Sequence, residues 1–177
     1  MKKLILSLFL LFSCLSSLDT QVNQQWVQRY NGPGNGIDQA TDIAVDVFGN
    51  VYVTGYSYGN GTGYDYSTVK YNSAGILLWE QRYVGFVWGH NNEDFAHSIG
   101  LDGAGNVYVT GYADEITLYR SFETIKYDSA GVQQWVQKYR GPIFTPPVPP
   151  FPRNTASLAV DVSGNVYVCG GMFEGSS

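Results

Sequence analysis

Six residues in segment 84–94 have side chains suited to binding a ligand. Two are aromatic and four are polar or acidic: Phe86, Trp88, His90, Asn91, Glu93 and Asp94. Aromatic rings offer a flat apolar surface to a sugar or a peptide, and polar groups add directional hydrogen bonds. The segment is therefore a candidate binding loop for a carbohydrate or a protein. The structural alternative is an ordinary long loop in which Trp88 packs at the rim of the domain.

The histidines and cysteines give no indication of catalysis. His90 and His97 are the only histidines, and no His-x-x-x-His or Cys-x-x-Cys spacing is present for zinc. The neighbouring carboxylates Glu93–Asp94 and Asp114–Glu115 could contribute to a calcium site, although such surface pairs are usually only solvated. We therefore expect no catalytic residue, no cofactor and no bound metal.

Asp, Asn and Gly recur in short segments of the form Asx-x-x-Gly. The Asx side chain can bond back to the backbone of a turn, and the Gly takes the positive φ that closes a type I turn with a bulge. A set of metal ligands is the alternative, but a turn explains both the residue types and their spacing. The segments are Asp46–Gly49, Asn72–Gly75, Asp102–Gly105, Asp128–Gly131 and Asp161–Gly164.

These turns belong to one sequence unit that occurs three times. Trp26, Trp79 and Trp135 open the three copies at intervals of 53 and 56 residues, and the third copy stops early. A fixed period of this size predicts stacked or radial copies of one supersecondary unit.

Each complete copy contains four short runs of strand-forming residues without helical periodicity. In the first copy the runs are Ile43–Asp46, Val51–Tyr56, Ser67–Tyr71 and Leu77–Tyr83. Both faces of the second run carry bulky groups, which indicates a sheet covered on both sides. A four-stranded antiparallel sheet between copies of itself is a propeller blade. We therefore predict an all-β fold of β-propeller blades.

The recurring motifs resemble the bacterial SBBP-type β-propeller repeat. They are Ile-Ala-Val-Asp-x-x-Gly-Asn-Val-Tyr-Val-Thr-Gly-Tyr, beginning at Ile43, and Thr-x-Lys-Tyr-Asx-Ser-Ala-Gly-x-x-x-Trp, ending at Trp79 and Trp135. The resemblance covers residues 26 to 171 and implies an exported propeller, with no catalytic residue to carry over. The closing Ser-Ala-Gly-x-x-x-Trp also resembles the tryptophan-docking motif of quinoprotein propellers, which implies that it locks one blade to the next.

The strands make two full blades and parts of others, whereas propellers close with 4–8 blades. We expect an incomplete ring, from a piece of a longer propeller or from chains that associate to close it. The expected division is a signal peptide at 1–19, an outer strand and lead-in at 20–39, blade 1 at 40–83, blade 2 with its preceding loop at 84–139, a Pro-rich connection at 140–154 and a partial blade 3 at 155–177.

Strand order assigns the connections to two faces. In an antiparallel blade the tight first and third turns share one face, and every long connection lies on the other. Variable loops on a rigid scaffold usually carry the binding residues, so this loop face is the expected binding site. Its segments are 57–65, 84–94, 113–121 and 140–154.

The N-terminus reads as an export signal. Lys2 and Lys3 precede an apolar run that is too short to cross a bilayer. Leu11–Cys14 resembles a bacterial lipobox, in which the cysteine is lipidated; the alternative is a cysteine inside an ordinary signal peptide. Cys169 is then expected to be a buried core thiol, because it stands where the other copies have Thr.

Composition excludes several partners. Without Lys2 and Lys3, 8 basic residues stand against 15 acidic ones, and no basic cluster exists. We therefore expect no nucleic-acid partner and no transmembrane helix. The prediction is an exported scaffold for protein or glycan binding, secreted, periplasmic or at the outer surface. The alternative is an enzyme, quinoprotein-like or sugar-cleaving, whose site in the central channel forms only in the full ring.

Overall fold

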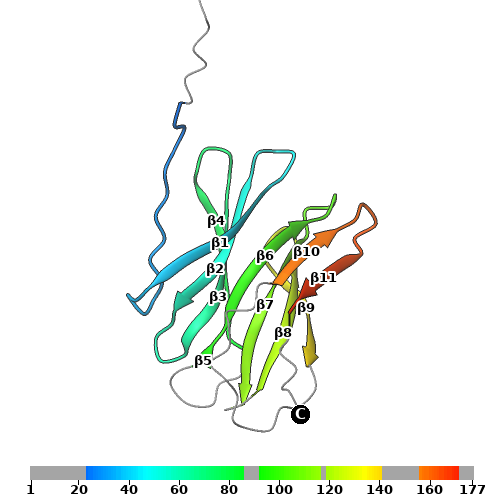
Figure 1. Ribbon diagram of the computed structural model, residues 1–177. Coiled ribbons are helices and arrows are strands. Elements are labelled where there is room, and N and C mark those ends of the chain that lie inside the picture. Colours follow the sequence, from blue (N-terminus) through cyan, green and yellow to red (C-terminus); the bar gives the residue numbers. More distant parts are fainter. Residues whose placement is uncertain (1–22, 86–91, 117–118, 141–155, 172–177) are drawn as a thin grey trace, which may run out of the picture.

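The computed structural model describes residues 23–85, 92–116, 119–140 and 156–171, which form three β-sheets (Figure 1). The strands are β1 (Asp38–Val45), β2 (Val51–Tyr58), β3 (Gly63–Tyr71), β4 (Leu77–Tyr83), β5 (Asn92–Glu93), β6 (Phe95–Leu101), β7 (Val107–Ile116), β8 (Tyr119–Tyr127), β9 (Gln133–Arg140), β10 (Ala156–Val160) and β11 (Val166–Gly170). None of the described residues is helical, so none of them forms a helix able to cross a membrane.

The predicted all-β class and the four-stranded antiparallel blades are confirmed. Blade 1 has the order β1-β2-β3-β4, blade 2 has β6-β7-β8-β9, and β10 and β11 form a two-stranded blade 3. The first strands of successive blades pack side by side, β1 on β6 and β6 on β10. Among the described strands the blades form an open arc and no closed ring (Figure 1).

Two predicted loops are in fact extensions of hairpins. The β2–β3 ladder continues through the pairs Ser57↔Asp65 and Tyr58↔Tyr64, so the predicted loop 57–65 shrinks to residues 59–62. The β7–β8 ladder likewise continues through Ala113↔Ser121. The fourth strand, Leu77–Tyr83, has the predicted bounds. The extensions were missed because their residues, rich in Tyr, Asp and Ser, are polar enough to read as loop.

The predicted Asx-x-x-Gly turns are confirmed. At the first turn Asp46 Oδ1 accepts hydrogen bonds of 2.9 Å from the backbone N–H groups of Phe48 and Asn50, and Gly49 has a φ of 78°. Asp46 Oδ2 also accepts bonds from Asn50 Nδ2 at 2.7 Å and from the Tyr52 hydroxyl at 3.1 Å. Burial opposes ionisation, but these hydrogen bonds hold the pKa of Asp46 below its usual value. The turns at Asp102 and Asp161 repeat this pattern.

The largest hydrophobic core lies between blades 1 and 2. Blade 1 contributes Tyr52 and Tyr66, which are buried against Ile99, Val107 and Ile125 of blade 2. Aromatic rings fill the space between sheets that twist apart, because each ring buries a large apolar area. The seam between two copies of the repeat is therefore the structural core of the molecule.

Trp79, in the fourth strand of blade 1, docks on the Ser-Ala-Gly turn of blade 2. Trp79 of β4 donates its indole N–H to the Ser129 carbonyl at 3.3 Å, and its ring covers Gly131. Lys70 donates to the same carbonyl at 3.1 Å, with its ammonium 4.9 Å from the centre of the Tyr52 ring. The blade-locking role implied by the resemblance is thereby borne out in this chain.

The lead-in segment 23–31 makes the same contact with blade 1. Trp26 donates to the Ser73 carbonyl at 3.1 Å, and Gln28 donates to the Gly75 carbonyl at 2.9 Å. The segment has no strand pairing of its own in the structure. Side-chain docking therefore places it where the fourth strand of a preceding blade would lie.

A pair of glycine substitutions separates turn strain from tryptophan docking. Gly131 and Gly105 have φ values of 86° and 80°, so Ala at either position should cost about 1–2 kcal/mol in backbone strain. A Cβ at residue 131 would lie 2.9 Å from the Trp79 ring, whereas one at residue 105 would meet only Ser129 at 3.5 Å. We expect Gly131→Ala to lower the free energy of unfolding by roughly 1–3 kcal/mol more than Gly105→Ala in urea titrations. Equal losses would mean that the docking contact adds no stability.

Candidate functional site

The residues predicted to bind a ligand divide into three groups. Phe86, Trp88, His90 and Asn91 lie outside the described residues. Glu93 is exposed on β5, which pairs in parallel with the start of β3. Asp94 is fully buried. Whether the loop binds a ligand stays a prediction, but the Asp94 carboxylate already has a structural task.

Asp94 closes the base of the candidate binding loop. Its Oδ2 accepts a hydrogen bond of 2.7 Å from the Gly85 N–H, and its Oδ1 accepts one of 3.0 Å from the Asp114 N–H. Its own N–H donates to the Tyr64 carbonyl at 2.8 Å. One residue thus ties together the two ends of the loop and the tip of the β7–β8 hairpin.

A second carboxylate lies buried in the same seam. Glu123 of β8 is fully buried and pairs with Lys138 of β9 at 2.7 Å. It also accepts hydrogen bonds from Ser121 Oγ at 2.9 Å and from the Tyr83 hydroxyl of blade 1. Burial raises the pKa of Asp94 to about 7 despite its two backbone hydrogen bonds, and the nearby charges of Glu123 and Asp114 add to the rise.

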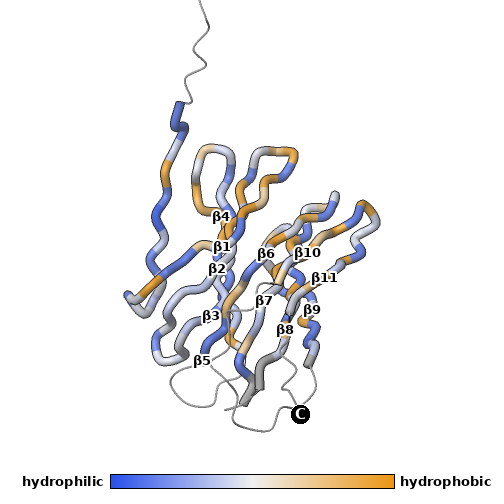
Figure 2. Tube along the Cα trace, in the orientation of Figure 1, coloured by the Kyte–Doolittle hydropathy of each residue, from blue (hydrophilic) through white to orange (hydrophobic). Residues whose placement is uncertain are grey.

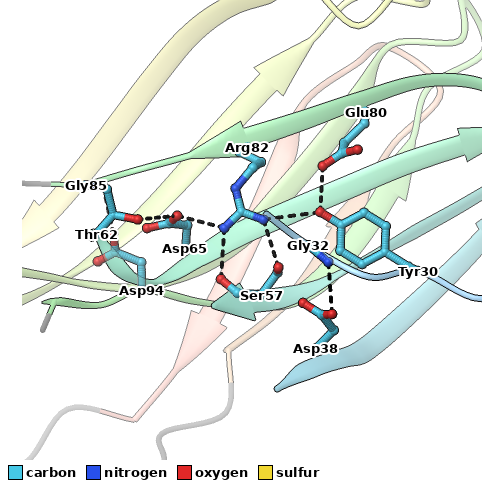
Figure 3. Close-up of polar contacts among 10 residues, drawn as sticks. All are labelled: Tyr30, Gly32, Asp38, Ser57, Thr62, Asp65, Glu80, Arg82, Gly85 and Asp94. Carbon is cyan, nitrogen blue, oxygen red and sulfur yellow. Dashed lines mark hydrogen bonds and ion pairs between the residues drawn. The ribbon is translucent and has the colours of Figure 1, made fainter. Parts of the chain in front are cut away.

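Blade 1 carries a matching ion pair (Figure 3). Arg82 of β4 pairs with Asp65 at 2.7 Å and holds Ser57 through its hydroxyl at 2.8 Å and its carbonyl at 2.9 Å. The Tyr30 hydroxyl accepts from Arg82 at 3.1 Å and donates to Glu80 at 2.5 Å. Arg82 therefore fixes the extended β2–β3 hairpin to the outer strand and to the lead-in.

The fourth strand thus docks at two points. In the motif Trp-x-x-x-Tyr, Trp79 contacts the next blade's tight turn, and Tyr83 contacts its buried cation–carboxylate pair. In the lead-in, Trp26 and Tyr30 make the corresponding contacts with blade 1. Sequence reasoning identified the tryptophan contact and missed the tyrosine contact, although the spacing of the motif recurs in all three copies.

His97 lies in β6, the first strand of blade 2. It is half-buried, and its ring centre lies 5.2 Å from that of Tyr112. The ladder register shifts at His97 and at its counterpart Thr41, which marks a β-bulge at each. Thr41 Oγ1 donates to the Ala96 carbonyl at 2.9 Å, so the bulge brings a polar side chain to the neighbouring blade.

One segment matches the spacing of a serine nucleophile elbow, Gly-x-Ser-x-Gly, at Gly55–Gly59. The elbow requires a sharp turn from a strand into a helix, with the serine exposed at the turn. Here Ser57 is fully buried within β2, and its hydroxyl accepts from Arg82. The geometry required of a nucleophile is absent at this serine.

The predictions for Cys169 and for metal binding have different outcomes. The expectation of a buried thiol is wrong, because Cys169 is exposed on β11, where no described residue covers that face of the strand. For metals, no cluster of three His, Cys, Asp or Glu side chains suited to an ion occurs among the described residues. Glu115 lies on β7, but its side chain is not described, so the calcium hypothesis has no further support.

A groove of about 300 Å³ opens between the lead-in and the outer face of blade 1. Its walls are mainly apolar, with a few polar residues among them, such as Gln28, Asp38 and Gln39. The lining includes Trp26, Tyr30, Ile43, Val51, Val53, Val69 and Tyr71. Figure 2 shows further hydrophobic segments at the tips of the β1–β2 and β3–β4 turns, where Phe48 is 81% exposed.

Two aspartates should respond to pH in opposite directions. The Asp94 pKa is raised to about 7 from 3.8, so its contribution to stability falls as the pH rises between about 4 and 7. The Asp46 pKa is lowered, so its contribution is lost on acidification below its usual pKa. We expect the difference in unfolding free energy between the wild type and Asp94→Asn to fall from pH 4 to pH 7. The difference between the wild type and Asp46→Asn should rise as the pH is raised from 2 to 5. Unfolding free energies from urea titrations test both, and a pH-independent difference for Asp94→Asn would contradict the assignment.

Comparison with known sequences agrees with the geometry. The β-propeller repeat SBBP matches residues 25–61 and 82–116. Each matched range starts near a Trp-x-x-x-Tyr motif and runs through the first two strands of the next blade, so the sequence unit spans a seam. No curated protein matches the chain. On the repeats, the blades and the seams together, residues 25–61 and 82–116 of this chain are SBBP β-propeller repeats.

Proposed function

We propose that this propeller scaffold is exported and binds a protein or glycan through the loop between β4 and β6, without turning its ligand over. The observation that carries the proposal is the fixed base of this loop. Gly85 and Asp94 are joined by a hydrogen bond of 2.7 Å, and β5 is paired to β3. A loop with anchored ends loses less conformational entropy on binding, because less of it remains to be ordered.

The surroundings of the loop suit recognition. The extended hairpins β2–β3 and β7–β8 flank its two ends, and Glu93 is exposed beside Asp114. The aromatic residues in the loop sequence, Phe86 and Trp88, supply the groups that dominate most binding sites. The proposed partner is therefore a sugar ring or an aromatic or aliphatic side chain of a protein, held at the loop face.

Binding can be tested on glycan and peptide arrays, followed by titration of any hit. We expect Trp88→Ala to weaken the affinity by about tenfold or more. Val132→Ser, at an exposed tip of a tight turn on the opposite face, serves as the control and should bind like the wild type. A ligand whose affinity is unchanged by Trp88→Ala and Phe86→Ala but lowered by Val132→Ser would move the site to the tight-turn face.

Catalysis is tested on the same ligand. Mass spectrometry after long incubation should recover it unchanged, as expected of a binding protein. Hydrolysed or oxidised product formed in proportion to protein concentration would support the enzyme alternative instead.

Export predicts a shortened mature chain. Expressed with its leader in a bacterial host, the chain should be recovered outside the cytoplasm without its first residues, as intact mass would show. Labelling with a radioactive fatty acid that is lost in Cys14→Ser would identify a lipid anchor, and cleavage without labelling would identify an ordinary signal peptide. Recovery of the uncleaved chain in the cytoplasm would refute the proposed location.

A further inference from the structure

The two ends of the arc carry the two halves of an interface that the chain already makes internally. Between blades 1 and 2, the receiving face of blade 2 includes Ile99, which is 7% exposed, and Val107 and Val109, which are fully buried. The corresponding residues of blade 1 are Ile43, Val51 and Val53. They line the groove on its outer face, and Ile43 is 61% exposed. The receiving face of blade 1 is therefore incompletely covered.

The lead-in covers only part of this receiving face. Trp26 and Tyr30 occupy the positions that Trp79 and Tyr83 take at the internal seam. The internal seam also receives Tyr52, from the second strand of the preceding blade. The groove walls include Ile43, Val51 and Val53, the counterparts of Ile99, Val107 and Val109 in the core around Tyr52. The groove therefore lies where a counterpart of Tyr52 would insert.

Blade 3 presents that counterpart at the other end of the arc. Tyr167 of β11 stands in the position of Tyr52, and its hydroxyl donates to Asp161 at 3.3 Å as Tyr52 donates to Asp46. Tyr52 is fully buried, whereas Tyr167 is 61% exposed. On the other face of blade 3, Leu158 contacts blade 2 at Gly100, so Tyr167 projects away from the arc.

We propose that the occupant of the groove is blade 3 of a second copy of this chain, which inserts Tyr167 beside the lead-in in a head-to-tail contact. The two surfaces differ, so the contact is heterologous and can be repeated to close a ring or extend a chain. It buries apolar groups at both ends and uses a geometry that the same sequence already adopts once within the chain.

Complementation of two variants tests this arrangement. Ile43→Lys blocks the receiving face, and Tyr167→Lys blocks the inserting face; both residues are exposed within one chain, so both variants should fold. Light scattering should show the wild-type mass rising with concentration. Each variant alone should need about tenfold or more protein to associate. An equimolar mixture should form a dimer, because one intact receiving face meets one intact inserting face. Val162→Lys, at a fully exposed turn position, should associate like the wild type.

The native thiol gives a readout that needs no substitution. Cys169 lies two residues beyond Tyr167 on the same face of β11 and is exposed. Maleimide labelling mapped to Cys169 should slow as the wild-type chain associates. The proposal is overturned by a wild type that stays monomeric at all concentrations, by a variant that associates over the same concentration range as the wild type, or by a mixture that does not dimerise. If the chain stays monomeric and an apolar dye binds in its groove, the groove belongs to another occupant.

Discussion

The molecule depends on one contact, that of the fourth strand of a copy with the blade that follows. At the tight-turn end of β4, Trp79 donates to the carbonyl of Ser129. The turn can accept the indole ring because Gly131 has no side chain. At the loop end Tyr83 reaches the buried Glu123. A single hydrogen bond of this kind contributes only about 1 kcal/mol. The two bonds, made by Trp79 and Tyr83 four residues apart on β4, act together with the core of buried tyrosines. They fix both the distance and the angle between the sheets.

Buried carboxylates lie both at the seam between blades 1 and 2 and where blade 1 meets the lead-in. Glu123 and Asp65 each have a cation from the adjacent outer strand, and Asp94 has two backbone N–H groups. A buried carboxylate that lost its partner would cost several kcal/mol, so sheets that slipped by one residue would be strongly disfavoured. Burial of the apolar rings stabilises the seam, and the carboxylates disfavour any register that would leave them unpaired.

The parts that sequence predicted well are those set by neighbours along the chain. The turn at Asp46 follows from Asp and Gly at a fixed spacing, because the carboxylate bonds to N–H groups only two and four residues away. The bounds of β4 were predicted because a Ser-Ala-Gly turn precedes it. Asp94 and Cys169 were harder, because burial depends on which blade stands opposite. From the sequence, Asp94 is expected in an exposed loop, but the structure buries it. Cys169 is expected in the core, but it is exposed and no described residue covers it. Likewise, the residues next to Tyr83 in the sequence give no sign of its contact with Glu123, which is 40 residues away.

The division of the docking contact between consecutive copies bears on how such a chain grows. Each four-stranded blade carries a docking strand at its end and an acceptor turn within it, so a tandem duplication adds one of each. The new neighbours then fit at once, without compensating substitutions. Loop lengths at the opposite face are free to diverge afterwards, since they do not contribute to the tryptophan contact. Gene duplication by whole units can therefore lengthen the arc while each older seam stays unchanged.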